Sequence, residues 1–335
     1  MLRFVDDTTP GITRRRRGRY WIYFDAEGNR ITDRDEIDRL NAIGLPPAYE
    51  RAWLCPIPNG HIQATGYDAR GRKQYRYHPD FRASQEAAKF DRCACFGEAL
   101  PRLRRRVAQD LEKKAVSREA VVAAVVRLLD HEHLRVGNET YAKSNKSFGA
   151  TTLRSRHVSL LGRAVKMRFK GKSGIERELT VTDRTLARIV RRCMDLPGQH
   201  LFQYIDDEGE TQPVSSTDVN DYIREVTGEE LTAKHFRTWA ASVIAFERLC
   251  TAGEEGISVK DMLEPVAQAL GNTPAISRKS YVHPALIEAV TANPRRPLGE
   301  LPCPPATAYL SSAERGFLLF LESEAKTDGQ RKKAA

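Results

Sequence analysis

The sequence predicts an α+β protein in which a small β-sheet-rich amino-terminal domain precedes a larger, mainly α-helical domain containing one β-hairpin. Aromatic and β-branched runs separated by turn residues fill the chain as far as Tyr77. From Asp80 onward apolar residues recur at helical spacing, except for two alternating segments that flank Gly171-Lys172-Ser173-Gly174. We therefore expect a basic arm at residues 1–19, a β-rich domain at 20–80, a helical domain at 81–325 and a disordered basic tail at 326–335.

The composition favours a polyanionic partner and a reducing compartment. The 335 residues include 54 Lys+Arg against 44 Asp+Glu, a net charge of +10. Nucleic acid is the simplest partner for such a charge, although a merely basic soluble protein fits it as well. Six cysteines without a paired CxxC spacing argue against a disulfide framework and against a metal site. With no signal peptide and no run of 18 apolar residues, we expect a cytoplasmic protein with no membrane partner.

The amino-terminal domain carries one strand that fits a nucleic-acid surface. Alternation along this strand places Lys73, Tyr75 and Tyr77 on one face, with Gln74 on the other. Basic residues interleaved with aromatic ones suit nucleic acid, whereas the alternative puts the tyrosines in the core. The cluster Arg14–Arg17 fits either a solvated, mobile segment or a contact with phosphates. We expect strands at Tyr20–Phe24, Glu50–Leu54, His61–Thr65 and Lys73–Tyr77, and a helix at Asp33–Ala42 capped by Thr32.

The second domain consists of helices interrupted by the hairpin. Val165, Met167 and Phe169 alternate with basic residues before the glycine-flanked turn, where the backbone of Lys172 is free to approach a ligand closely. The helices expected are Ala83–Phe96, Pro101–Lys114, Arg118–His131, Asp183–Met194 capped by Thr182, Thr217–Val226, Ala233–Cys250, Val259–Leu270, Ala285–Ala292 and Ala313–Glu322.

The stretch Leu270–Tyr281, LGNTPAISRKSY, is where the chemistry is expected to centre. Gly271 is typical of a helix end, and Thr273-Pro274 is typical of the cap and first position of the next helix, which we expect to carry Tyr281 about two turns in. A tyrosine hydroxyl has a pKa of about 10, so it is a poor nucleophile unless cations and hydrogen-bond donors stabilise the developing charge.

Cationic residues of the right kinds occur upstream of this tyrosine. Arg135 lies in HLRVGNETYAK, and Lys234 and Arg237 lie three residues apart in TAKHFRTW. Guanidinium groups match the geometry of phosphate oxygens, and an ammonium such as that of Lys172 can protonate a departing alkoxide. Together with Asn272 and Tyr281, these residues suit the attack of a phenol on a phosphodiester.

The motifs RVGNETY, FKGKSG, KHFRTW and TPAISRKSY occur in this order, and the chain from about Gly18 to about Pro284 resembles the type IB DNA topoisomerases, in the small poxvirus-like form found in bacteria. It is more distantly similar to the tyrosine recombinases. The resemblance implies that residues 81–325 form the catalytic domain and that residues 20–80 bind DNA. It also implies that Tyr281 is the nucleophile, that Arg135, Arg237 and Asn272 hold the phosphate, and that Lys172 is the general acid.

The same resemblance assigns DNA contacts. It implies that Gln74, Tyr75, Tyr77 and Lys73 lie on the DNA groove, that Asn138 and Tyr141 contact DNA beside Arg135, and that Lys234 assists Arg237. Poxvirus members carry histidine where this chain has Asn272; asparagine can donate a hydrogen bond but cannot be a cation. The partner is double-stranded DNA, clamped by a monomer, and no cofactor or metal is implied. The sequence contains no GxxxxGK[ST] phosphate loop, which agrees with a reaction that uses no nucleotide cofactor.

Two rival functions remain open on the sequence. A tyrosine recombinase would share the catalytic residues but pair four protomers, and such enzymes usually begin with a helical domain. A DNA-binding architectural protein would use only the basic surface, and Tyr281→Phe would then leave its activity intact.

Overall fold

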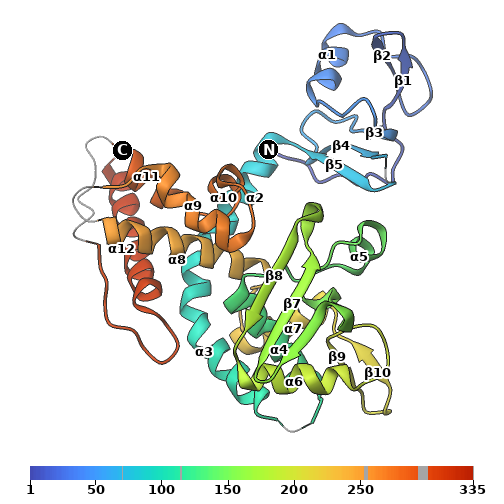
Figure 1. Cartoon of the computed structure of the whole chain (residues 1–335). Helices are drawn as coiled ribbons and strands as arrows, with labels where there is room; N and C mark the ends of the chain where they lie inside the picture. Colours follow the sequence, from blue (N-terminus) through green and yellow to red (C-terminus); the bar gives the residue numbers. More distant parts are fainter. Residues whose placement is uncertain (70, 114, 253–255, 293–300, 335) are drawn as a thin grey trace. The chain divides into compact units, whose positions relative to one another are not determined.

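The chain folds into two compact units, Met1–Ala88 and Lys89–Ala335. The computed structural model describes residues 1–69, 71–113, 115–252, 256–292 and 301–334 (Figure 1). Helices and small antiparallel sheets confirm the α+β class. The boundary expected between residues 80 and 81 falls within helix α2 (Pro79–Asp91), which begins in the first unit and ends in the second.

The described part of the first unit contains two small sheets, helix α1 (Arg34–Ala42) and most of α2, with a core that includes Tyr23, Leu40 and Leu54. Within the segment expected to be a basic arm, the arginine cluster forms a strand that pairs with the next one. The cap of the helix is Asp33 rather than Thr32, since the Asp33 side chain accepts a hydrogen bond from the Asp35 backbone. The elements are β1 (Thr13–Arg17) paired with β2 (Tyr20–Phe24), α1 (Arg34–Ala42), and the sheet of β3 (Glu50–Leu54), β4 (Ile62–Tyr67) and β5 (Lys73–Tyr77).

The second unit is a helical body around one large core. The break expected before Pro101 does not occur: α3 runs through this proline, because Phe96, Leu100 and Leu103 on either side are at most 1% exposed and hold the helix by packing. The expected end of that helix at Lys114 lies outside the described residues. The helices are α3 (Cys93–Leu111), α4 (Arg118–Glu132), α5 (Glu139–Asn145), α6 (Arg184–Met194), α7 (Ser216–Thr227), α8 (Lys234–Ala252), α9 (Val259–Leu270), α10 (Pro274–Ser280), α11 (Pro284–Thr291) and α12 (Ser312–Ala334).

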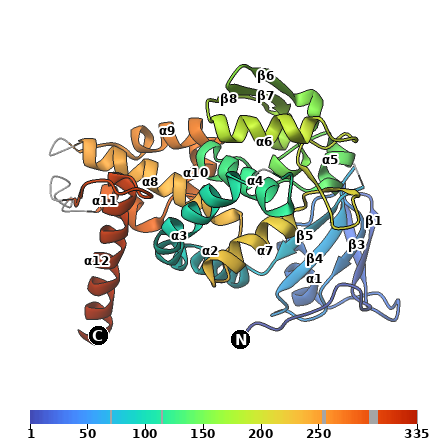
Figure 2. The ribbon, with the colours of Figure 1, turned by 90° about the horizontal axis from the view of Figure 1, so that it is seen from below.

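The predicted hairpin is present and gains a third strand. β7 (Ala164–Lys170) pairs with β8 (Glu176–Val181) across the glycine-flanked turn, and β6 (Val158–Leu161) pairs with the other edge of β7. Val165, Met167 and Phe169 point into the core, and Figure 2 shows the sheet lying along α6. Asp183, rather than Thr182, caps α6 by accepting from two backbone amides. A short second hairpin of β9 (Gln203–Ile205) and β10 (Thr211–Pro213), absent from the sequence prediction, follows α6.

The carboxyl-terminal segment differs from the expectation of a disordered tail at 326–335. Helix α12 continues to Ala334, because Glu322, Glu324 and Lys326 extend a helix-forming sequence, while residue 335 lies outside the described chain. No helix in the described part of the chain is long and apolar enough to cross a lipid bilayer.

Candidate active site

Arg135 is positioned by the turn that ends α4. His133 adopts the left-handed conformation at the helix end, with φ of 51°, and turns the chain so that Arg135 lies beside the loop between α9 and α10. The Arg135 guanidinium donates to Asn272 Oδ1 at 3.0 Å and to the Tyr281 hydroxyl at 3.4 Å. Arg135 is thereby grouped with two residues that lie 137 and 146 positions further along the chain.

Arg237, in the first turns of α8, is the most buried cation of this group, with 4% exposure. Its guanidinium donates to the His133 carbonyl and, at 3.0 Å, to the Leu270 carbonyl, and it lies 4.9 Å from the centroid of the Tyr281 ring. Burial, followed by the charge of Arg135, lowers the pKa of Arg237 to about 10. The buried Nε of Arg237 has no hydrogen-bond partner among the described residues.

Tyr281 closes α10, so it lies at the end of the helix rather than within it. The expected cap is confirmed, since Thr273 accepts from the Ile276 backbone and Pro274 takes the first position. Burial alone would raise the pKa of Tyr281, but the charges of Arg237 and Arg135 and their hydrogen bonds together lower it. The phenol is therefore easier to ionise than an ordinary tyrosine.

Asn272 presents its amide to the same place. It follows Gly271, whose φ of 61° ends α9 in the left-handed conformation, as the sequence predicts. Asn272 Oδ1 accepts from Arg135, while Nδ2 is buried and has no partner in the described part of the chain. A donor in this state is available to an incoming acceptor.

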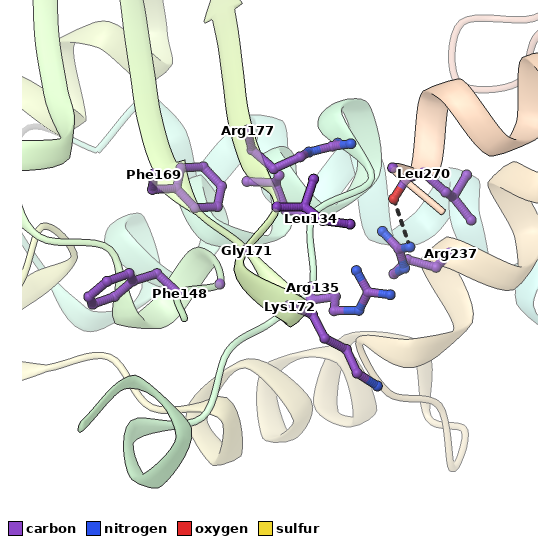
Figure 3. Close-up of a pocket in the computed structure, with 12 residues that line it drawn as sticks. Leu134, Arg135, Phe148, Phe169, Gly171, Lys172, Arg177, Arg237 and Leu270 are labelled. Atoms are coloured by element: carbon purple, nitrogen blue, oxygen red, sulfur yellow. Dashed lines mark hydrogen bonds between the residues drawn. The ribbon is translucent and has the colours of Figure 1, made fainter. Parts of the chain in front are cut away.

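Lys172 lies at the tip of the β7–β8 hairpin and faces the same cavity. A hollow of about 540 Å³ is lined by Arg135, Lys172, Asn272 and Tyr281, together with residues of α9. Figure 3 shows Arg135 and Arg237 converging on the inner part of the site from different elements, with Lys172 extending from the hairpin tip beside Arg135.

The three cations that were predicted from the sequence to act in this site are not paired with carboxylates. Arg135, Arg237 and Lys172 form no ion pair with any residue that the structure describes. Elsewhere in the unit, by contrast, Arg104 pairs with Asp130 at 2.7 Å and Arg118 with Asp218 at 2.7 Å. The site is thus cationic, and neutral carbonyl and amide groups hold its arginines in place.

The chain also matches known protein families. Residues 78–292 match the family described as "Eukaryotic DNA topoisomerase I, catalytic core", and residues 20–68 match "Bacterial DNA topoisomerase IB, N-terminal domain". The chain belongs to the type IB DNA topoisomerases. It is an isomerase of a family that relaxes DNA by transient cleavage.

Relatives of the enzyme include viral proteins. It is 32% identical over 297 residues to DNA topoisomerase 1B of Acanthamoeba polyphaga mimivirus, covering 85% of this chain and 88% of that one. It is 21% identical over 254 residues to DNA topoisomerase 1B of Vaccinia virus (strain Copenhagen), covering 72% and 76% of the two chains. Among solved structures, XerH site-specific recombinase bound to palindromic difH substrate has a TM-score of 0.38 and 16% identity, over 58% of this chain and 51% of that one.

The structure brings five of the residues singled out in the sequence to two adjoining cavities that share Arg135 and Lys172: Arg237 lines one of them, and Asn272 and Tyr281 line the other. Their catalytic roles stay predictions. Lys234 does not join them: it is exposed at the first position of α8, and it lines neither cavity of the site.

The DNA-binding residues expected in the first unit lie together on β5. Tyr75 and Tyr77 are 41% and 40% exposed, and their rings stack with centroids 5.9 Å apart. Lys73 forms an ion pair with Asp7 at 2.6 Å, and Gln74 donates to Asp68 at 3.2 Å. These contacts position the strand face, while DNA binding by it stays a prediction.

Two further residues were expected to contact DNA beside Arg135. Asn138 is exposed immediately before α5. Tyr141 belongs to α5, but its side chain lies outside the described residues.

Two further cations of the site were not predicted from the sequence. The Lys89 ammonium donates to the Ser280 carbonyl and lies 4.9 Å from the Tyr281 ring centroid. Arg177, on β8, donates to the Ala269 carbonyl at 3.3 Å and lies against Gly271, where a Cβ would stand 2.2 Å from its guanidinium. Burial and then the Arg135 charge lower the pKa of Arg177, whereas the Glu132 charge raises it. The alternation of the hairpin could have drawn attention to Arg177; Lys89 has no local signal.

Proposed function

We propose that the enzyme relaxes supercoiled duplex DNA by a transient break in one strand, with Tyr281 as the nucleophile. The Tyr281 oxygen attacks the phosphorus of a phosphodiester, and the bond to the 5′-oxygen breaks, which leaves a 3′-phosphotyrosyl linkage. The phenol loses its proton to solvent, and the departing 5′-oxygen gains one from the Lys172 ammonium. The freed strand rotates, and the 5′-hydroxyl then attacks the phosphotyrosyl bond to restore the strand.

The observation that carries this proposal is the set of unneutralised cations around one phenol. Arg135 donates to the Tyr281 hydroxyl, and Arg237 lies over its ring. A phosphorane-like transition state gains charge on its non-bridging oxygens, and preorganised donors in a partly buried site stabilise such charge strongly. The unpartnered Arg237 Nε and Asn272 Nδ2 are suitable donors.

Lys172 suits the general-acid role because of its position. It lies at a hairpin tip that lines the same cavity as Tyr281, and Gly171 and Gly174 flank the turn. An alkoxide leaving group is strongly basic, so a proton delivered from the ammonium lowers the barrier to cleavage. Lys172→Ala should therefore slow cleavage of an ordinary DNA strand far more than cleavage of a strand whose leaving group is a 5′-thiolate, which needs no proton.

The reaction needs neither ATP nor metal on this proposal, because the phosphotyrosyl bond conserves the energy of the broken phosphodiester. We further propose that the enzyme acts as a monomer that clamps duplex DNA, with β5 of the first unit contributing contacts, and that it resides in the cytoplasm on the nucleoid. Lys234 and Asn138, both exposed, are then DNA-contacting neighbours of the catalytic residues.

The test is relaxation of negatively and positively supercoiled plasmid in EDTA without ATP. Wild type should relax both signs and leave a covalent adduct on the 3′ end of the cleaved strand when stopped with detergent. Tyr281→Phe should do neither, while Tyr204→Phe, which removes the hydroxyl of another half-buried tyrosine, should behave as wild type. If Tyr281→Phe still relaxes plasmid, the nucleophile is assigned wrongly. Relaxation that occurs only in a tetramer would favour a recombinase.

A further inference from the structure

The strands β1 and β2 form a two-stranded ribbon that projects arginines into solvent. They pair from Thr13↔Phe24 to Arg17↔Tyr20, and the turn between them consists of Gly18 and Arg19. Gly18 has φ of 62°, the conformation that a two-residue hairpin requires at its first position. The turn is therefore tight, and the arginines beside it stand at a fixed end of the ribbon.

Arg14 anchors the ribbon and is distinct from its neighbours. Its guanidinium donates to the Leu45 carbonyl at 2.8 Å and to the Pro46 carbonyl at 2.5 Å, and it lies 4.0 Å from the centroid of the Trp21 ring. Burial lowers the pKa of Arg14. Across the pair, Tyr23 is 2% exposed, which defines this face of the ribbon as the inner one.

The outer face is basic and aromatic. Because side chains alternate along a strand, Arg15 and Arg17 point away from the core. Arg17 is paired with Tyr20, which is 78% exposed, and the Arg15 guanidinium lies over the Phe24 ring at 4.9 Å. Arg19 is exposed in the turn, and none of these three arginines forms an ion pair with a residue that the structure describes.

We propose that the β1–β2 ribbon is a second DNA-contacting site, in which Arg15, Arg17 and Arg19 bind backbone phosphates of the duplex. A two-stranded ribbon has the width that the major groove of B-DNA admits, and arginine forks match phosphate oxygens. The turn and its flanking residues thus hold three cations in a fixed arrangement, which suits a regular polyanion. The inference rests on the proposed action on duplex DNA but not on Tyr281.

This site lies largely outside what the family matches describe. They cover residues 20–68 and 78–292, so β1 and the turn precede them. On this proposal, Arg15, Arg17 and Arg19 add contacts to uncleaved DNA beyond those made by the matched segments. The consequence is that the enzyme stays on one DNA molecule at higher salt than it would without these contacts.

The test compares the full-length Arg15→Ala/Arg17→Ala/Arg19→Ala variant with wild type, both carrying Tyr281→Phe so that binding is measured without cleavage. The probe is a linear duplex without a chosen site, and its dissociation constant is measured across a salt series. Each phosphate contact contributes about 0.9 to the slope of log affinity against log salt, so three lost contacts should reduce the slope by about 2.7. Arg17→Ala/Arg19→Ala, confined to the end of the ribbon, should reduce it by about 1.8.

Two controls separate a site from a general charge effect. Arg15→Lys/Arg17→Lys/Arg19→Lys keeps the charge and should keep the salt slope. Arg30→Ala/Arg34→Ala/Arg248→Ala removes the same charge from other exposed positions and should also leave the slope unchanged. If the latter lowers the slope as much as the ribbon variant, the ribbon is not a site. An unchanged slope in the ribbon variant likewise overturns the proposal, and lost binding to phosphatidylglycerol vesicles would then indicate a membrane surface instead.

The outcome is independent of the proposed chemistry. With Tyr281 restored, the ribbon variant should relax plasmid as wild type does at low salt, and should release it between turnovers at a lower salt concentration than wild type. If wild type relaxes nothing while the ribbon variant still loses its salt slope, the proposed function fails and the ribbon site stands.

Discussion

Replacing Lys89 tests how the nucleophile is held and activated. Its ammonium lies 4.9 Å from the Tyr281 ring centroid and donates to the carbonyl of Ser280, the residue before the nucleophile. Lys89→Met keeps most of the alkyl stem but removes the charge and the hydrogen bond. Lys89→Arg keeps both and is the matched control.

The size of the effect follows from these two contacts. A cation over an aromatic ring contributes about 0.5 to 1 kcal/mol when exposed and about 2 when desolvated, and Tyr281 is half-buried. The ring gains electron density as the phenol ionises, so this attraction is stronger in the transition state than in the ground state. We therefore expect a loss of about 1 to 2 kcal/mol, which slows cleavage about 5- to 30-fold.

The assay is single-turnover formation of the covalent adduct under saturating enzyme, with the dissociation constant measured separately in the Tyr281→Phe background. Lys89→Met should be slow with nearly unchanged affinity, and Lys89→Arg should remain close to wild type. A Lys89→Met rate within twofold of wild type refutes the reasoning. Weakened DNA affinity at an unchanged rate would instead make Lys89 a phosphate contact.

Three further outcomes are expected. Arg237→Lys keeps the charge but cannot hold both backbone carbonyls, so single-turnover cleavage should slow by about 2 to 4 kcal/mol, or about 30- to 1000-fold, at an unchanged dissociation constant. Because the two arginines lower the pKa of Tyr281, a cleavage rate limited by ionisation of the phenol should rise with pH and level off at a midpoint below 10; a midpoint at or above 10 contradicts this. Arg104→Met leaves Asp130 and Glu314 buried without their cation, and urea unfolding should show a loss of about 3 to 5 kcal/mol.

The elements that the sequence predicted best are those with strong signals at both ends. Strands β2, β3 and β5 and helix α9 have the predicted bounds, because turn residues or caps flank each of them. Gly271 and Thr273-Pro274 specify the junction before Tyr281 in the same way. Local chemistry decides such positions, so a single sequence reveals them.

The features that the sequence did not reveal depend on partners distant in the chain. Four consecutive arginines have no strand pattern, and β1 forms because β2 pairs with it and Arg14 finds carbonyl acceptors 31 and 32 residues away. Lys89 reaches Ser280 across 191 residues, and Arg177 reaches Ala269 across 92. No local periodicity marks such contacts, since they exist only once the helices have packed.

The choice of hydrogen-bond partners distinguishes the structural arginines of the second unit from those of the site. Arg104 is surrounded by the carboxylates of Asp130 and Glu314, which neutralise its charge and fix α4 against α12. Arg237 donates to the carbonyl oxygens of His133 and Leu270, which fix its geometry without neutralising its charge. Burial and the charge of Arg135 lower its pKa. A carboxylate beside Arg237 would hold it equally well, but would compete with a phosphate for the same donors. The cations of the site thus repel one another in the free enzyme, and an anion that binds between them reduces this repulsion.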